Sequence, residues 1–341
     1  MQYFIYDKEG RKQALLQNCT SIQWMPKYYS SGSFEIHARR TTDNDAYLVE
    51  GNRIVCTDRN EIGFITGVQI QDQAIEVRGS LDNLSARINL GTATIRNIEA
   101  SLLKLVEENK RGLDINVGAP KGLTPTIKSG SDTSYSNLAD DFEDYCQKGG
   151  LGWREIVHEG KLNYLEIYQG QLKRNAVFSD DLGNIKSQSY EINLSKYKNV
   201  AYVFGEDTGS YRKSIIVDIR SNKEEDIREL YVDARDIQGE YKEDGVEKQY
   251  TWEEYQAMLE QRGQQKLADA NKDAYKFEFD PYSQIAELGK DYDLGDIVVV
   301  KSNQYKIVAL ARVTELKFIE EANTDTQVEI TTNIESREVL Q

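Results

Sequence analysis

Hydrophobic and polar residues alternate along residues 1–93. In SGSFEIHAR, residues 31–39, apolar side chains take every second position, and the opposite, polar set includes His37. The segment GFITGVQIQ, residues 63–71, repeats this alternation, with Phe64 and Val68 on one side. A period of two is typical of a β-strand with one solvated face. Short strands separated by turns predict a small β-barrel or β-sandwich in this region.

The hydrophobic period changes to that of a helix at Asn97. Asn97 is a suitable N-cap for a helix that ends near Gly112, and NLADDFEDYCQKGG predicts a second helix that stops at the glycine pair Gly149 and Gly150. Two strands then follow before residue 169. We expect a small α/β domain, with a long loop over residues 112–136 because two prolines and a GSDTSYS tract lie there.

Strand patterns return after residue 186, in NVAYVFGE and RKSIIVDIR. Residues 222–271 are highly charged and helical in character, and Thr251 and Glu254 have the spacing of a capping box. From Asp291 onward the pattern is β again, with apolar residues in both phases. These last strands are therefore expected to be covered on both faces.

The segment DYDLGDIVVV, residues 291–300, places three acids and a glycine ahead of a β-branched run. Its carboxylates are suitable ligands for a hard cation such as calcium, but the segment lacks the distal bidentate acid of an EF-hand loop. Aspartates accept hydrogen bonds from downstream amides and glycine tolerates positive φ, so the alternative is a tight turn into a strand. The sequence favours the turn, formed by Asp291, Asp293, Gly295 and Asp296.

Composition narrows the classes of function. The chain has 341 residues, enough for more than one domain, and a formal net charge of −15 without a basic patch, which disfavours tight binding of duplex nucleic acid. The segment MQYFIYDKEGRK is not a signal peptide, and no apolar run is long enough to span a membrane, so we expect a soluble protein made in the cytosol. Cys19, Cys56 and Cys146 lack the spacing of a disulfide framework or zinc site.

Candidate catalytic groups are few. The two histidines, His37 and His158, are interpreted as solvated side chains in a strand and a turn, although a pair of Cys146 with His158 remains conceivable. No phosphate-binding or dinucleotide-binding glycine motif is present. The acid pairs Asp140 with Asp141 and Glu253 with Glu254 are interpreted as exposed helical residues. The residues alone therefore predict no active site, cofactor or metal.

The order of several segments resembles the siphovirus tail-hub family, typified by the ReqiPepy-type phage tail protein. The resemblance covers most of the chain and depends on the ordered combination of motifs, since no single motif is specific. The motifs are SGSFEIHA, LVEGNRIV, EIGFITGVQI, GGLGWREIV, AVFSDDLGNIKSQSYEINLSKYKNVAYVFGE, RELYVDARDI, TWEEYQAMLEQRGQQKL and DYDLGDIVVV.

The resemblance implies an α+β, mainly β fold. Two tube-like β-barrel or β-sandwich domains are expected, one over residues 1–93 and one from residues 186–221 and 278–341. A small α/β domain would occupy residues 94–185, and a charged helical insertion residues 222–277. In this arrangement the acidic turn at Asp291 leads into a strand of the second β-domain.

The resemblance also implies a structural protein of the virion tail. Such hubs form a homotrimeric ring at the distal end of the tail tube, in the baseplate or tail tip, and join the tube to the host-recognition apparatus. The implied partners are the tail tube or distal tail protein and other tail-tip subunits, with DNA passing without specific binding and without insertion into a membrane. An intact siphovirus, a defective prophage and a contractile bacteriocin are all possible sources.

Two other functions remain open at this point. One is a calcium-stabilised or carbohydrate-active β-protein that uses Asp291, Asp293 and Asp296. The other is a monomeric adhesin whose tyrosines, 21 in the chain, bind a host glycan.

Overall fold

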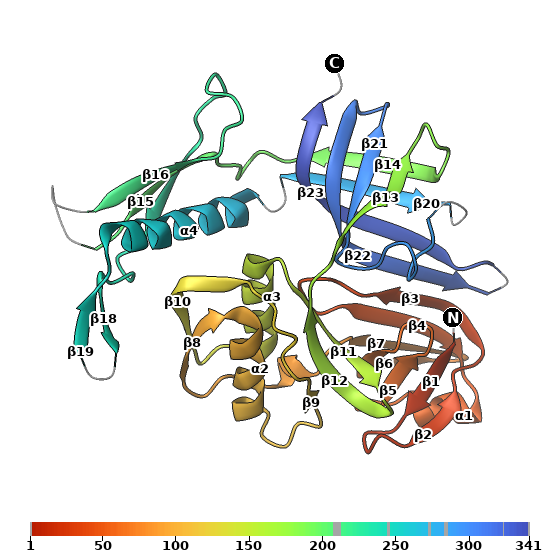
Figure 1. Ribbon diagram of the computed structural model, residues 1–341. Helices are drawn as coiled ribbons and strands as arrows, with labels where there is room; N and C mark the ends of the chain where they lie inside the picture. The colour runs from red at the N-terminus through yellow and green to blue at the C-terminus, as the bar shows by residue number, and fades with distance from the viewer. Residues whose placement is uncertain are drawn as a thin grey trace. The chain divides into compact units, whose positions relative to one another are not determined.

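The computed structural model describes residues 2–206, 213–243, 246–271, 274–282, 286–322 and 324–339. Within them the fold is mainly β, as the sequence predicted, and the strands form large antiparallel sheets without a closed barrel. The chain divides into two compact units (Figure 1). Unit 1 comprises Met1–Pro125, Asp132–Tyr190 and Phe277–Gln341, and unit 2 comprises Thr126–Ser131 and Glu191–Lys276.

Unit 1 begins with antiparallel strands in the spatial order β2-β1-β5-β6-β7-β4-β3. The elements are β1 (Tyr3–Tyr6), β2 (Lys12–Leu15), β3 (Cys19–Met25), β4 (Ser33–Arg39), α1 (Thr42–Tyr47), β5 (Arg53–Cys56), β6 (Glu61–Gln71), β7 (Ala74–Ser80) and the 3-10 turn η1 (Leu84–Ala86). The alternation predicted for β4 is confirmed, because Phe34, Ile36 and Ala38 are buried. These apolar side chains face the core with Trp24, which stacks on Phe34.

The prediction for β6 was wrong beyond its midpoint. Val68 and Ile70 are exposed, although the alternation placed them with the buried Phe64. A register shift between Ile65 and Gly67 interrupts the pairing of β6 with β7. Beyond this bulge, residues of both phases of β6 are exposed, so the end of the strand has no buried face, which counting by two does not anticipate.

The α/β region contains both predicted helices. Its elements are β8 (Thr92–Asn97), α2 (Ile98–Asn109), β9 (Asn116–Val117), β10 (Thr126–Ser134), α3 (Leu138–Gly149), β11 (Gly152–His158) and β12 (Lys161–Tyr168). The Asn97 side chain accepts a hydrogen bond from the Ala100 N–H at 2.8 Å, so the predicted cap is confirmed. The α3 helix ends at Gly150, in the left-handed conformation. The expected long loop is interrupted by β9 and β10.

The remaining strands of unit 1 continue the sheet that β1–β7 begin. They are β13 (Leu172–Ser179), β14 (Ile185–Ile192), β20 (Tyr275–Pro281), β21 (Ile297–Ser302), β22 (Ile307–Glu321) and β23 (Gln327–Val339). The long strand β22 pairs with β21 and β23, and its last residues pair with β3. Phe178, Phe277 and Phe318 therefore share one hydrophobic core with Trp24.

Unit 2 contains a three-stranded sheet and a helix that packs on it (Figure 1). Its elements are β15 (Val200–Phe204), β16 (Ser214–Asp218), β17 (Glu229–Asp233), β18 (Glu240–Glu243), β19 (Val246–Gln249) and α4 (Trp252–Asn271). The predicted capping box is confirmed, since the Thr251 N–H donates to Glu254 Oε2 at 2.8 Å and the Glu254 N–H to Thr251 Oγ1 at 3.2 Å.

Unit 2 differs from the expected arrangement of residues 186–277. Strands β15 and β16, expected in the second β-domain, pair with each other, and β15 also pairs with β17 from the expected helical insertion. The apolar side chains of all three strands pack against α4, which joins them into one core. The four-domain division of the chain stays a proposal. Among the described residues, no helix combines the length and hydropathy of a membrane span.

Candidate functional site

The acidic segment at residues 291–296 forms a tight turn that leads into β21. Gly295 has φ of +91°, which suits glycine, and the Asp296 N–H donates to the Asp293 carbonyl at 3.0 Å. The Asp293 N–H in turn donates to Asp296 Oδ2 at 3.0 Å. This pattern is the local hydrogen bonding that makes aspartate and glycine favourable in turns.

The carboxylates of the turn bind protein donors. Asp296 Oδ1 accepts the Gln171 N–H at 2.7 Å, and Asp291 Oδ2 accepts the Glu287 N–H at 2.9 Å. Asp293 Oδ1 accepts the N–H of its neighbour Leu294, and it also accepts a hydrogen bond from Nη2 of the half-buried Arg59 at 3.0 Å. The three acids therefore point to different parts of the chain, and among the described residues they do not form a group of metal ligands.

Millimolar calcium chloride is expected to leave the melting temperature of the protein unchanged, because the turn carboxylates are already bonded. Thermal unfolding followed by circular dichroism checks this, with magnesium chloride at equal ionic strength as the control. A saturable rise that disappears in the Asp293→Asn variant would instead establish a calcium site, since a ligand that binds only the folded state raises its stability.

Tyr28 lies behind this turn and connects several distant segments of unit 1. Its side chain is fully buried. The hydroxyl donates to the Gly150 carbonyl at 3.0 Å and accepts the Gly170 N–H at 2.9 Å. Its backbone N–H donates to the Thr314 carbonyl at 2.9 Å. Burial raises the pKa of Tyr28, so the hydroxyl remains protonated and able to donate. We call Tyr28, Gly150, Gly152, Gly170 and Gly295 the Tyr28 junction.

Three glycines of the junction are sterically required. A Cβ atom on Gly295 or on Gly152 would lie 2.2 Å from Tyr28 Cε2. A Cβ atom on Gly170 would lie 1.8 Å from the Gly295 carbonyl oxygen. Segments that are far apart in the sequence therefore approach one another more closely than any side chain would allow.

Two arginines complete the contacts around the junction. Arg312 Nη1 donates to the Gly295 carbonyl at 3.0 Å, and its guanidinium lies 5.6 Å from the centre of the Tyr28 ring. Arg59 Nε pairs with Glu61 Oε1 at 2.9 Å, and Glu61 Oε2 accepts Nε1 of Trp24 at 2.7 Å. The acidic turn is thereby connected to both β-regions of unit 1, which are the strands β1–β7 and the strands of unit 1 from β13 onward.

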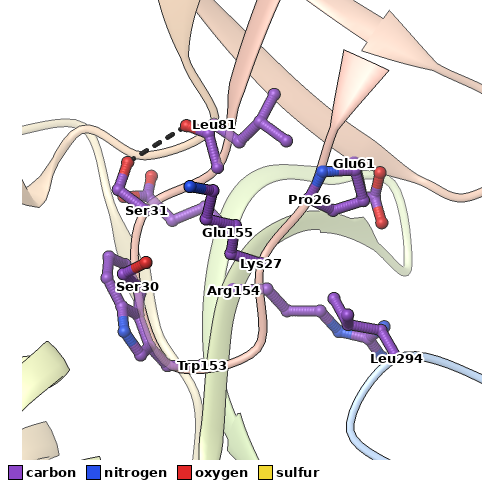
Figure 2. A pocket seen from close by; sticks show the side chains of 11 residues that line it. Pro26, Lys27, Ser30, Ser31, Glu61, Leu81, Trp153, Arg154, Glu155 and Leu294 are labelled. Atoms are coloured by element: carbon purple, nitrogen blue, oxygen red, sulfur yellow. Dashed lines mark hydrogen bonds between the residues drawn. The ribbon is translucent and has the colours of Figure 1, made fainter. Parts of the chain in front are cut away.

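A small cavity of about 20 Å³ lies in the same part of unit 1 (Figure 2). Its lining includes Ser31, Trp153 and Glu155. The volume suits one water molecule and is far below the roughly 300 Å³ at which ligand pockets begin. The cavity is therefore too small for a sugar or a peptide.

Glu155 is a buried acid in the wall of this cavity. Its side chain is 1 % exposed, Oε1 accepts the Asn83 N–H at 2.6 Å, and Oε2 has no hydrogen-bond partner. Burial raises the pKa of Glu155 to about 8, and nearby Asp82 adds to the effect, whereas Arg53 opposes it. The carboxyl group is thus mainly neutral at pH 7.

A wider hollow of about 870 Å³ lies beside α1 and the turn between β6 and β7. Among its charged lining residues, Arg40 binds Asp45 and the backbone of Asp72. Arg40 Nη2 contacts Asp45 Oδ2 at 2.9 Å, and Arg40 Nη1 donates to the Asp72 carbonyl at 3.2 Å. The Arg40 guanidinium is therefore already occupied by protein acceptors.

The candidate catalytic residues have no catalytic arrangement. Cys146 is fully buried on α3, and burial raises its pKa, as is typical of an unreactive cysteine. The ring of His158 packs on Tyr164 with the ring centres 4.5 Å apart. Asp141 was expected to be exposed, which was wrong. It is buried and accepts hydrogen bonds from Thr133 and Ser136, both at 2.6 Å.

Sequence reasoning identified the acidic turn but missed Tyr28, Arg59 and Glu155. The glycines in GGLGW and YQGQ indicate possible close approaches of the backbone, yet nothing local shows what they approach. Glu155 has the strand pattern of an ordinary polar position, and only the tertiary structure, in which the distant Asn83 N–H binds its carboxylate, shows that it is buried.

A family comparison gives a match over much of the chain. The model of the family described as Siphovirus ReqiPepy6 Gp37-like protein matches residues 109–332, more than half of the sequence. A comparison with curated proteins gives no match.

Several solved structures have a similar fold along nearly the whole chain. A tail protein from Neisseria meningitidis MC58 matches with a TM-score of 0.64 and 12% identity, covering 98% of this chain and 97% of that one. The 43 kDa tail protein of prophage MuSo2 from Shewanella oneidensis matches with a TM-score of 0.63 and 13% identity, covering 97% of both chains. Prophage tail protein gp18 from Listeria monocytogenes EGD-e has a TM-score of 0.61 and 12% identity, covering 98% and 96%.

Proposed function

Because the chain belongs to the Siphovirus ReqiPepy6 Gp37-like protein family, we propose that it is a structural protein of a phage tail. The observation that carries this proposal is the fold similarity over nearly the full length of three chains that are described as tail proteins. Two of those proteins come from prophages, so a prophage particle is a suitable source for this one.

Within the tail, we propose a hub at the distal end of the tail tube. Three copies would form a ring that joins the tube to the host-recognition apparatus. Unit 1 suits such a role because β22 pairs with β3 as well as with β21 and β23, which makes both β-regions parts of one sheet. Strands such as β2 and β14 end the sheet among the described residues, and pairing or covering of such edges by a neighbouring subunit protects them.

The proposed role requires a rigid fold and does not require catalysis. The Tyr28 junction holds segments from both β-regions and the α/β region at fixed positions, and the turn at Asp291, Asp293, Gly295 and Asp296 is proposed to be structural. The small cavity and the burial of Cys146 support a non-enzymatic protein. A net charge of −15 would also reduce sticking of DNA during its passage through a channel.

Antibodies against this chain are expected to label only the distal end of tails in particles released from the source strain. Electron microscopy with gold-labelled antibodies measures the position, and quantitative mass spectrometry should give three copies per tail. Label along the whole tube, or label on capsids, would contradict the hub. Absence of the chain from purified tails would contradict the structural role altogether.

A further inference from the structure

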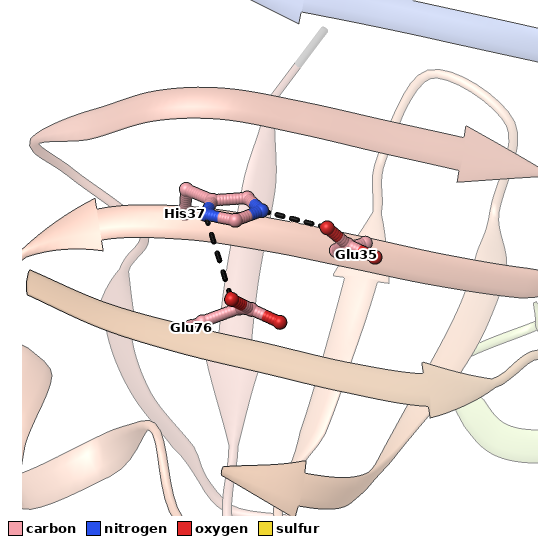
Figure 3. Close-up of side chains that lie close together, drawn as sticks. All are labelled: Glu35, His37 and Glu76. Atoms are coloured by element: carbon pink, nitrogen blue, oxygen red, sulfur yellow. Dashed lines mark hydrogen bonds and ion pairs between the residues drawn. The ribbon is translucent and has the colours of Figure 1, made fainter. Parts of the chain in front are cut away.

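Three side chains of metal-binding residue types, two glutamates and a histidine, meet on the partly exposed face of β4 and β7 (Figure 3). His37 Nε2 lies 2.7 Å from Glu35 Oε1, and His37 Nδ1 lies 3.9 Å from Glu76 Oε2. One ligand atom from each residue lies within 4.8 Å of the other two. We call Glu35, His37 and Glu76 the β4–β7 cluster.

The strand register brings these three residues together. His37 is directly opposite Glu76 in the antiparallel pair of β4 and β7. Glu35 is two residues before His37, so it lies on the same face of the sheet. Directly opposite residues in a sheet have their Cβ atoms about 5 Å apart. The cluster is therefore positioned by paired strands on both sides of β4 and needs no loop to order.

We propose that Glu35, His37 and Glu76 form a binding site for a divalent transition metal ion such as Zn²⁺. Imidazole nitrogen and carboxylate oxygen are both ordinary zinc ligands, and three protein ligands leave one position for water. Ligand atoms around a tetrahedral zinc ion are about 3.4 Å apart. One ligand atom of each residue lies within 4.8 Å of the other two, so the two glutamate side chains would rotate toward His37 to reach this spacing around an ion.

The exposure of the cluster fits the entry of an ion from solvent. The side chains of His37, Glu35 and Glu76 are 41%, 33% and 20% exposed, so they are accessible without being fully solvated. A site on an open sheet face keeps its remaining coordination position in contact with solvent. Such a site is suited to binding an ion reversibly.

Arg78 is the competing cation at this site. Its Nε lies 3.4 Å from Glu35 Oε2, and its Nη2 contacts Glu76 Oε1. Arg78 is paired with Glu35 in the register of β4 and β7, so its position is as well defined as those of the ligands. A bound metal would replace Arg78 as the partner of the two carboxylates. Removing the guanidinium should therefore strengthen metal binding, because like charges repel.

Zinc titration by calorimetry in a non-chelating buffer tests the proposal. The Cys19→Ser background is used throughout, because Cys19 is a partly exposed thiol on the adjacent strand β3. One zinc ion is expected to bind per chain. His37→Ala should abolish this binding, and Glu35→Gln or Glu76→Gln should weaken it by about tenfold or more.

Two further variants separate a metal site from unspecific binding. His158→Ala removes the other histidine of the chain and is expected to bind zinc like the background protein. Arg78→Gln is expected to bind zinc several-fold more tightly. Circular dichroism spectra of all variants check that folding is retained, and X-ray absorption of the zinc-loaded protein should show one imidazole ligand with oxygen ligands.

Three outcomes would overturn the proposal. They are no saturable zinc binding by the background protein, unchanged binding by the His37→Ala variant, and weaker binding by the Arg78→Gln variant. None of these outcomes depends on the proposed tail function, because the titrations use the isolated chain. The position of the protein in a tail particle is tested independently by the antibody labelling.

Discussion

Replacing Gly295 with alanine is expected to lower the free energy of unfolding by about 4 kcal/mol. The residue has φ of +91°, which a side chain rarely adopts, and the new Cβ atom would lie 2.2 Å from the buried ring of Tyr28. The ring cannot retreat, because its hydroxyl bonds to Gly150 and Gly170 and its other side faces packed residues. Equilibrium unfolding in urea measures the loss.

Gly289→Ala is the matched control for this substitution. Gly289 has φ of +83°, yet no atom lies within 4 Å of the position of its Cβ. Its replacement should therefore cost only the backbone strain, about 1 kcal/mol. Equal losses for the two variants would show that the close approach to Tyr28 contributes nothing, which would contradict the structural role of the junction.

Tyr28→Phe is the second variant, in case the Gly295→Ala protein does not fold. Phenylalanine retains the buried ring but leaves the Gly170 N–H and the Gly150 carbonyl without their partner. The expected loss is about 2 kcal/mol, since a buried polar group left unpaired retains its full desolvation cost. A loss near zero would mean that the hydroxyl does not hold these segments together.

Replacing Glu155 with glutamine is expected to make the protein more stable at pH 8 and to leave its stability at pH 4.5 nearly unchanged. Burial raises the pKa of Glu155 from 4.5 to about 8, so the folded protein retains a proton that the unfolded chain releases. The stability linked to this proton is fully present below pH 4.5 and is lost as the pH rises to 8. The loss is on the order of 4 kcal/mol.

Glutamine removes this pH dependence because an amide does not ionise. Its oxygen can still accept the Asn83 N–H, which Glu155 Oε1 accepts at 2.6 Å. Urea unfolding at several pH values between 4.5 and 8 measures the difference between the variant and the original protein. Asp82 and Arg53 are the charged groups that act on Glu155, and both are retained in the variant.

Glu159→Gln provides the control for the pH series. Its side chain is 79% exposed, so the same chemical change should alter stability little at any pH. A difference between Glu155→Gln and the original protein that is constant from pH 4.5 to 8 would contradict a buried, neutral carboxyl group. It would show instead that the effect comes from packing.

The sequence predictions succeeded for features whose interactions join residues close together in the sequence. The N-cap at Asn97, the capping box of Thr251 with Glu254, and the end of α3 at Gly150 all depend on residues within a few positions, and all were predicted. The alternation in β4 was also predicted. The error at Val68 and Ile70 arose beyond a bulge in the pairing with β7, where both faces of β6 are exposed, and the exposure of a strand face depends on what packs on it.

The candidate sites show the same limit. Aspartates and a glycine ahead of a β-branched run indicate a turn, because their hydrogen bonds are local. Nothing near Tyr28 in the sequence indicates that Gly150, Gly170 and Gly295 surround it, since those residues are more than a hundred positions away. The meeting of His37 with Glu76 likewise depends on the register between β4 and β7.

The amino-acid sequence by itself determined the mainly β character, the helix caps, the turn at Gly295 and the resemblance to tail hubs, because these are recorded in local pattern and order. Only the tertiary structure decided that both β-regions share one sheet, that Tyr28 joins distant segments, and that Glu155 is buried. The physical reason is that burial and pairing depend on which distant segments meet, and the local sequence around a residue does not specify its distant neighbours.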